Sequence, residues 1–372
     1  MGPCLEGTRV LDLSQYLPGP YAAQMLADLG AEVVKVEPPS GDPMRTLGPC
    51  DGDGVSAFYK LINAGKSVVR LDLKSAAGRS DLEALVRGAD VLLESFRPGA
   101  LGRLGFGAEA LRALNPGLIH CALSGFGQSG PYAGRAGHDI TYMALAGGLA
   151  TSGTPARPVV AHPPAADFAG GMQAVLTVLA ALLRRVRDGR GATLDVSLAE
   201  TVLAWQGVVL TGARRGDGMS RGHGLLNGGA ACYRIYETAD EKFVALGALE
   251  AKFWVGFCRA LGRPAWIARQ NEPLPQDDLI AEVEAAIRTR ARDEWVAQLA
   301  GVDCCFQPVL EPLEVPRDPH LAARGLIRET GGPEARLEVG FPALIDGQAP
   351  APRAPLVERT ADEVAAAWSR QP

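Results

Sequence analysis

Histidine and aromatic residues are scarce in this chain of 372 residues, and neither sign of charge dominates. There are 5 histidines and 6% aromatic residues, and 37 basic side chains stand against 42 acidic ones, for a net charge of −5. A protein that binds nucleic acid or an anionic membrane mainly through its surface normally carries a clear basic excess. The composition therefore predicts no nucleic-acid partner and no membrane partner.

Long hydrophobic runs are also missing. No uninterrupted apolar segment reaches the roughly 18 to 20 residues that span a bilayer. The first residues, Met1 to Glu6, lack a charged region followed by an apolar core, which a secretory signal would have. We therefore expect a cytoplasmic protein.

Cysteines are few and scattered. The 7 cysteines are odd in number, form no C-x-x-C pair, and have no histidine at a spacing suited to zinc. They are predicted to be reduced structural thiols, and we expect no metal site.

What the sequence does contain is a regular alternation of apolar strands and helices over residues 1–211. Strands are predicted at 9–13, 31–36, 67–71, 91–94, 118–123 and 193–196, and helices at 21–29, 81–87, 109–114, 170–186 and 197–210. Strands that alternate with helices indicate an α/β fold with a doubly wound, Rossmann-like parallel sheet. In such folds ligands bind at the carboxyl ends of the strands.

The pattern changes after a polar, glycine-rich segment at 212–229, which is predicted to be a linker. Residues 230–311 are predicted to form a smaller α+β domain, with strands at 231–236, 242–246 and 304–310 and helices at 251–261, 278–289 and 293–299. The proline-rich residues 312–372 are predicted to be an extended return segment that packs on the large domain. A capping box at Thr360 to Glu363 begins its closing helix.

Three side chains are candidates for chemistry. His138 lies between Gly137 and Asp139, where an imidazole can either transfer protons or serve as a satisfied turn or core histidine. Asp167 precedes the glycine pair Gly170 and Gly171 at the expected start of an apolar helix.

Asp167 has two interpretations there. It is either the N-cap of that helix, or a base or nucleophile whose substrate oxygen is held by the N–H groups of Gly170 and Gly171. Glu250 stands where a strand ends and a helix begins, and it is either a helix-start acid or a third catalytic group.

Several linked motifs give the chain a family resemblance. The segments that carry it are Ser14 to Pro39, Leu71-Asp72-Leu73-Lys74, Glu94-Ser95-Phe96-Arg97-Pro98-Gly99, Arg103-Leu104-Gly105, Gly125 to Pro131 and Asp188-Gly189-Arg190-Gly191. Together they resemble the family III CoA-transferases (CaiB/BaiF). The resemblance implies acyl-CoA substrates, no cofactor beyond the CoA of the substrate, and an interlocked homodimer. It also implies an active site between the large domain of one chain and the small domain of the other.

Within that family, the segments around His138, Asp167 and Glu250 resemble the α-methylacyl-CoA racemase branch. The resemblance implies that His138 and Asp167 form a proton-transfer pair, with Glu250 near the histidine. The predicted function is inversion of the α-carbon of a 2-methylacyl-CoA by 1,1-proton transfer through an enolate. The alternative is an acyl-CoA:carboxylate CoA-transferase, in which Asp167 is the nucleophile and acyl groups pass through anhydride intermediates.

The resemblance also implies a set of CoA-binding residues. They are Leu71, Asp72, Leu73, Lys74, Ser95, Phe96, Arg97, Arg103, Gly137, Asp139, Ile140, Thr141 and Tyr142. Two features depart from the racemase pattern: a longer segment from Gly41 to Lys66, and Pro38 where relatives often carry a CoA-contacting arginine. Arg45 is the proposed substitute for that arginine.

Overall fold

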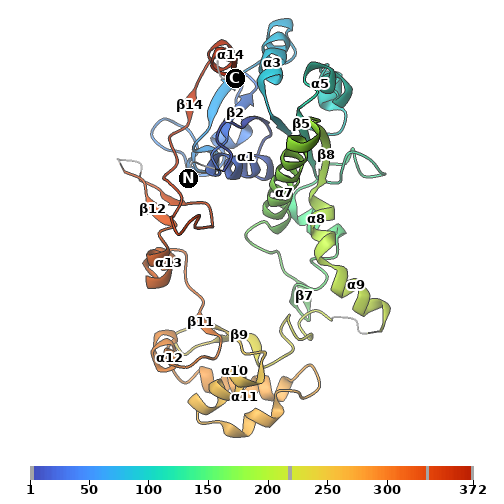
Figure 1. Ribbon diagram of the computed structural model, residues 1–372. Coiled ribbons are helices and arrows are strands. Elements are labelled where there is room, and N and C mark those ends of the chain that lie inside the picture. The colour runs from blue at the N-terminus through green and yellow to red at the C-terminus, as the bar shows by residue number, and fades with distance from the viewer. Residues whose placement is uncertain (1–3, 217–219, 332–334, 370–372) are drawn as a thin grey trace. The chain divides into compact units, whose positions relative to one another are not determined.

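The fold was analysed in a computed structural model that describes residues 4–216, 220–331 and 335–369 (Figure 1). The chain divides into two compact units: Met1–Ala146, Pro163–Ala204 and Pro319–Pro372 form unit 1, and Gly147–His162 and Trp205–Asp318 form unit 2. These units differ from the predicted ranges: Gly147–His162 and residues 205–211 group with unit 2 and not with the large domain, and residues 312–318 group with unit 2 and not with the return segment. Helix α9 (Gly207–Arg214) extends into the predicted linker, of which residues 217–219 lie outside the described residues.

Unit 1 is built on a seven-stranded sheet with the order β14-β3-β2-β1-β4-β5-β8. Its strands are β1 (Arg9–Leu13), β2 (Glu32–Glu37), β3 (Ser67–Arg70), β4 (Val91–Glu94), β5 (Ile119–Ser124), β8 (Ala192–Ser197) and β14 (Val357–Glu358). Every neighbouring pair is parallel, and Val10 of β1 pairs with Val33 on one side and Val91 on the other. The predicted doubly wound α/β fold is confirmed for this unit.

Helices pack on this sheet in two groups (Figure 1). The first group is α1 (Pro18–Asp28) and α7 (Ala165–Asp188), which pack on each other and on the strands. The second is α3 (Ala76–Gly88), α5 (Ala108–Leu114) and α14 (Ala361–Ser369), with α14 and α5 each against α3. Fully buried Leu11, Leu82 and Leu92 lie in the core between this second group and the sheet. Parallel strands with both faces covered are apolar throughout, which explains their short unbroken apolar runs.

Helix α7 begins five residues before the predicted start at Gly170, at Ala165. By length and composition alone it is long and apolar enough to cross a membrane. One side of it is nevertheless buried against α1, β5 and β8, with Ala166, Ala174 and Val178 nearly inaccessible to solvent. This packing is that of a core helix of unit 1.

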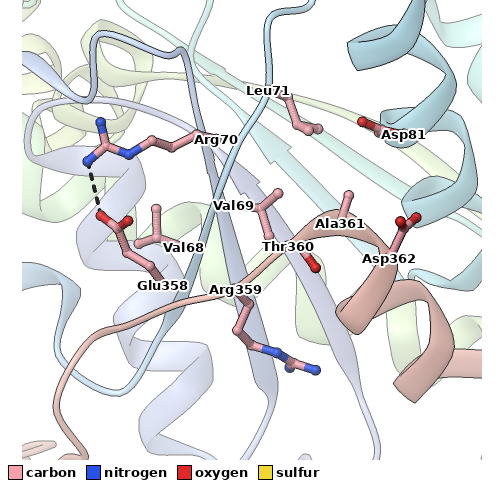
Figure 2. Close-up of a pocket in the computed structure, with 10 residues that line it drawn as sticks. All are labelled: Val68, Val69, Arg70, Leu71, Asp81, Glu358, Arg359, Thr360, Ala361 and Asp362. Atoms are coloured by element: carbon pink, nitrogen blue, oxygen red, sulfur yellow. Dashed lines mark hydrogen bonds and ion pairs between the residues drawn. The ribbon is translucent and has the colours of Figure 1, made fainter.

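The return segment adds an edge strand to the sheet. β14 pairs in parallel with β3, and Arg70 of β3 forms an ion pair with Glu358 of β14 at 3.0 Å (Figure 2). A second pair of short strands, β12 (Ile327–Glu329) and β13 (Leu337–Val339), precedes it. The segment was predicted to be extended, and these two- and three-residue strands are too short to produce a visible alternation.

Unit 2 contains an antiparallel sheet with the order β11-β10-β9. Its strands are β9 (Tyr233–Glu237), β10 (Phe243–Gly247) and β11 (Phe306–Pro308), and its larger helices are α10 (Ala251–Ala260), α11 (Asp277–Ile287) and α12 (Arg292–Leu299). Trp254, Phe257 and Trp295 are buried in its core. Gly147–His162 contributes a small hairpin of β6 (Gly153–Thr154) and β7 (Arg157–Pro158).

Candidate active site

The candidate site lies where the strand order of the sheet reverses. The chain runs from β1 outward to β2 and β3, and then returns to place β4 on the other side of β1. The loops that leave β1 and β4 therefore diverge, and doubly wound folds bind ligands in the crevice between them. Here the backbone N–H of Gln15, after β1, donates to Ser95 Oγ, after β4, at 3.1 Å.

One pocket of unit 1 opens at this crevice and contains two of the predicted catalytic residues. It is lined by residues from the loop after β1, the loop after β4, the segment after β5 and the first turn of α7. His138 and Asp167 both line it. The structure thus brings together two side chains that are 29 positions apart in the sequence.

His138 is the N-cap of α6 (Asp139–Leu145). Its backbone N–H donates to Thr141 Oγ1 at 3.0 Å, and the Thr141 hydroxyl donates to the His138 carbonyl at 2.7 Å. The residue is exposed, and among the residues that the structure describes no hydrogen bond engages its imidazole. The main chain of His138 is therefore fixed while its ring is free to meet a ligand, which rules out a core histidine.

Asp139 joins α6 to α7. Its Oδ1 accepts from the backbone N–H of Ala166 at 2.7 Å and of Asp167 at 3.1 Å. These N–H groups belong to the first turn of α7 and have no partner within the helix. The structure therefore gives Asp139 a role that the sequence did not reveal, as a cap of α7, while CoA binding by Asp139 stays a prediction. It corrects one expectation: Asp167 is not the N-cap but lies inside the first turn, with Pro164 as the N-cap.

The environment of Asp167 makes it a stronger base than an ordinary carboxylate. Burial, the largest cause, and the negative charge of Asp139 raise the pKa of Asp167 while His138 lowers it, and the net result is a pKa of about 6. A carboxylate with this pKa is mostly ionised at pH 7, yet its proton affinity is closer to the operating pH, where acid–base catalysis is most efficient.

Gly170 and Gly171 do not form the predicted oxyanion hole. They lie in the second turn of α7, where their N–H groups bond to carbonyls of the preceding turn. Both are glycines because of close packing: an added Cβ would lie 2.1 Å from Leu198 Cδ2 at Gly170, and 2.7 Å from the Pro18 carbonyl oxygen at Gly171. Gly171 thus lets the start of α7, and Asp167 with it, approach α1, and Gly170 lets it approach Leu198.

The side chain of Tyr142, in α6, packs beside the pocket of His138 and Asp167. It is buried, and its ring fills the space beside Gly125 and Gly137, where an added Cβ would lie 2.4 and 2.5 Å from its Cε1. Burial, together with the charges of Asp167 and Asp139, raises the pKa of Tyr142 to about 12. Its phenol therefore stays protonated and neutral beside the pocket.

The predicted CoA-binding residues fall into two adjoining pockets. Leu71, Asp72, Leu73, Lys74 and Phe96 line a pocket with Pro38, while Ser95, Phe96, Arg97, Gly137 and Tyr142 line the pocket of His138. Phe96 and Gln15 line both, so the two pockets are neighbours. Leu71 also faces the hollow beside β14 (Figure 2). CoA binding by these residues stays a prediction.

Four other residues predicted to bind CoA line neither pocket, namely Arg103, Asp139, Ile140 and Thr141. Thr141 is occupied by the main chain of His138, Ile140 is exposed on α6, and Arg103 ends the short helix α4 (Ala100–Arg103). Arg45 does not itself line the pocket of Pro38, but its guanidinium pairs at 2.7 Å with the buried carboxylate of Glu37, which does, and stacks on Tyr59. Its role as a substitute for a CoA-contacting arginine stays a prediction.

Glu250 lies in unit 2, as the exposed N-cap of α10. Its side chain makes no capping hydrogen bond, but its place at the start of α10 agrees with the interpretation as a helix-start acid that interacts with the helix dipole. Its predicted role near His138 stays a prediction.

Several lining residues were missed by the sequence interpretation. Gln15, Tyr16, Pro18, Arg135 and Leu198 all line the pocket of His138 and Asp167. Gln15 to Pro18 directly follow the first strand of a doubly wound sheet, a position from which a ligand-binding loop is expected. Among the described residues, no group of three His, Cys, Asp or Glu side chains could hold a metal ion, and all seven cysteines are free thiols.

Comparison with known proteins places this site in a family. The model of "CoA-transferase family III" matches residues 5–359. Human alpha-methylacyl-CoA racemase is 35% identical over 331 residues, which cover 86% of this chain and 81% of the human protein. Acetyl-CoA:oxalate CoA-transferase of Acetobacter aceti is 33% identical over 341 residues, covering 89% and 87%. The crystal structure of a CAIB/BAIF family protein from Brucella suis superposes with a TM-score of 0.83, at 28% identity and with 99% of both chains covered.

Proposed function

Because this chain belongs to CoA-transferase family III, we propose that it is an acyl-CoA racemase that inverts the α-carbon of a 2-methylacyl-CoA by proton transfer. The observation that carries the proposal is the presence of His138 and Asp167 in one pocket, with the imidazole unengaged and the carboxyl pKa raised to about 6. A racemase needs both groups. A transferase needs the carboxylate alone.

The proposed reaction uses the two side chains in turn. One of them takes the α-proton from the thioester, leaving an enolate, and the other, in its protonated form, returns a proton to the opposite face of the carbon. The electron pair of the broken C–H bond is held in the enolate and then forms the new C–H bond. Reaction in the opposite direction exchanges the two roles.

The alternative is a CoA-transferase, and two observations favour it. The A. aceti transferase is about as similar to this chain as the human racemase is. Asp167, ionised above pH 6, is also a competent nucleophile for a thioester carbonyl. In that reaction the carboxylate oxygen bonds to the acyl carbon and CoA thiolate leaves. The thiolate then attacks the aspartyl carbonyl of the anhydride, which releases the first acid as a carboxylate, and the reverse steps with a second carboxylic acid give the new acyl-CoA and restore the Asp167 carboxylate.

We further propose that the functional unit is a homodimer in which Glu250 of one chain completes the site of the other. Helix α7 supports this proposal, because Met172, Leu176 and Leu183 are 52%, 61% and 70% exposed. Their spacing of four and seven places them along one side of the helix. Such a row of exposed apolar residues is typical of a surface that another chain covers.

One experiment separates the two enzymatic functions. Purified protein is incubated in D₂O with a single enantiomer of a 2-methylacyl-CoA and with no free carboxylic acid. A racemase incorporates deuterium at the α-carbon and yields both enantiomers, which mass spectrometry and chiral chromatography measure. Absence of α-deuteration in this incubation, together with transfer of CoA to a carboxylic acid added in a second incubation, would contradict the racemase and support the transferase.

A further inference from the structure

Tyr16 has an unfavourable backbone conformation at the edge of the candidate site. Its φ is 64°, in the left-handed region that residues with a Cβ atom rarely adopt. It lines the pocket of His138 and Asp167, and 48% of it is exposed. Strained residues of this kind persist only when the surrounding structure imposes them, and they gather at functional sites.

Buried polar groups fix the chain on the upstream side of Tyr16. Ser14 donates to the buried carboxylate of Asp12 through its N–H at 3.0 Å, and the Ser14 carbonyl accepts from the fully buried Lys35 ammonium at 2.7 Å. The N–H of Gln15 is held by Ser95. The two residues before Tyr16 therefore have no freedom to relax its backbone.

Close packing fixes the chain on the downstream side. A Cβ added to Gly19 would lie 2.2 Å from Ser14 Cβ, so the chain closes on itself between Ser14 and Gly19. Helix α1 begins at Pro18, whose ring restricts φ. Tyr16 is thus at the tip of a short closed loop that is anchored at both ends.

The side chain of Tyr16 makes few contacts that would stabilise the fold. Among the described residues it makes no hydrogen bond, ion pair or ring contact, and it is not part of the core. It lines the pocket together with the apolar Pro18 and Leu198, which lie against Gly171 and Gly170 of α7. Gln15, Ser95, Arg97 and Arg135 supply polar side chains to the same pocket.

We propose that Tyr16 is a specificity-determining residue whose ring limits the bulk of the acyl group that reaches Asp167. The inference rests on the proposed action on acyl-CoA thioesters. An acyl chain is apolar, so it occupies the side of the pocket formed by Tyr16, Pro18 and Leu198. Removal of even one methylene-sized obstruction typically changes discrimination between substrates by tenfold or more, and a phenol ring is considerably larger.

The test compares two acyl-CoAs that differ in bulk, propionyl-CoA and 2-methyl-3-phenylpropionyl-CoA. The measured quantity is the ratio of their kcat/KM values for α-proton exchange in D₂O. In Tyr16→Gly this ratio should shift at least tenfold towards the bulky substrate, whereas Tyr16→Phe, which keeps the ring, should stay within about threefold of the wild type. An unchanged ratio in Tyr16→Gly, or an equal loss for both substrates, would overturn the proposal.

Glycine is the informative replacement because it also accepts the left-handed conformation. The melting temperature of Tyr16→Gly should therefore not fall below that of the wild type. Glu241→Gly is the matched control, since Glu241 also has a positive φ, of 59°, but lies in unit 2 at a turn between β9 and β10. Glu241→Gly should leave the substrate ratio unchanged.

Failure of the proposed function is distinguishable from failure of this inference. If the wild type exchanges no α-proton, the proposed racemase is wrong, and the dissociation constants of the same two acyl-CoAs are then measured by calorimetry. A tenfold shift of their ratio in Tyr16→Gly alone would still support Tyr16 as the selecting residue. An unchanged ratio of dissociation constants would refute it.

Discussion

Asp139 Oδ1 accepts a hydrogen bond from the backbone N–H of Asp167 at 3.1 Å. One carboxylate thereby anchors the first turn of α7, and its charge also contributes to the raised pKa of the other. Because Asp139 directly follows His138 in the chain, this hydrogen bond also places His138 close to Asp167. The candidate catalytic pair is therefore assembled by a residue that takes no part in the proposed proton transfer.

The two roles of Asp139 can be separated by substitution. Asp139→Asn keeps an acceptor oxygen and removes the charge, so the pKa of Asp167 should fall and the acid limb of the kcat/KM profile should move to lower pH. Asp139→Ala loses the cap as well, and should destabilise the protein by about 1 kcal/mol. Urea unfolding and pH–rate profiles measure the two effects. An acid limb that stays in place in Asp139→Asn would show that the charge has no such influence.

His138 is the residue that decides between the two enzymatic functions. His138→Ala should reduce α-proton exchange by about 10² to 10⁴, the usual contribution of a general acid–base group, with little change in the urea midpoint because the imidazole is exposed. His162→Ala, at another exposed histidine that lies outside the pocket, is the matched control and should retain full activity. Undiminished exchange in His138→Ala would exclude the histidine from the reaction.

The raised pKa of Asp167 also predicts how stability depends on pH. Burial of the charged form raises its pKa from 3.8 to about 6, so the folded state binds a proton between these values that the unfolded state releases. Stability from this group is complete below pH 4 and is lost as the pH rises through 6. Asp167→Asn should therefore be more stable than the wild type at pH 8, by about 1 to 2 kcal/mol, with the difference vanishing near pH 4. Equal unfolding free energies at pH 8 would contradict this.

The glycine pair of α7 offers a test of packing. Gly171→Ala places a methyl group against the rigid Pro18 carbonyl and should destabilise unit 1 by about 1 to 3 kcal/mol. Gly170→Ala meets only the end of the flexible Leu198 side chain, and the gain in helix propensity partly offsets that contact, so its effect should be smaller. Denaturant midpoints measure both variants. Equal losses of stability in the two variants would mean that contact with the Pro18 carbonyl does not cause the destabilisation in Gly171→Ala.

The proposed homodimer predicts a mass in light scattering of about twice 39.0 kDa. Leu176→Glu places a charge in the exposed apolar row of α7 and should shift the protein towards the monomer, with loss of activity if the partner supplies Glu250. A fully active monomer would contradict the proposal.

The sequence by itself determined the alternation of strands and helices, the doubly wound sheet and the family. These features depend on local apolar patterns and on short motifs, which a linear chain displays directly. It also identified His138 and Asp167 as candidates, because each stands in a motif of its own.

Only the tertiary structure decided what several of those residues do. The capping of α7 by Asp139 was missed and Gly170 and Gly171 were predicted to be oxyanion donors, because a residue type does not reveal which distant backbone it meets. The edge strand β14 and the loop that holds Tyr16 were missed for the same reason. Their conformations are imposed by partners far along the chain, namely β3 for the strand and Lys35 and Ser95 for the loop. Such contacts form only when the sheet and the loops that follow its strands have folded.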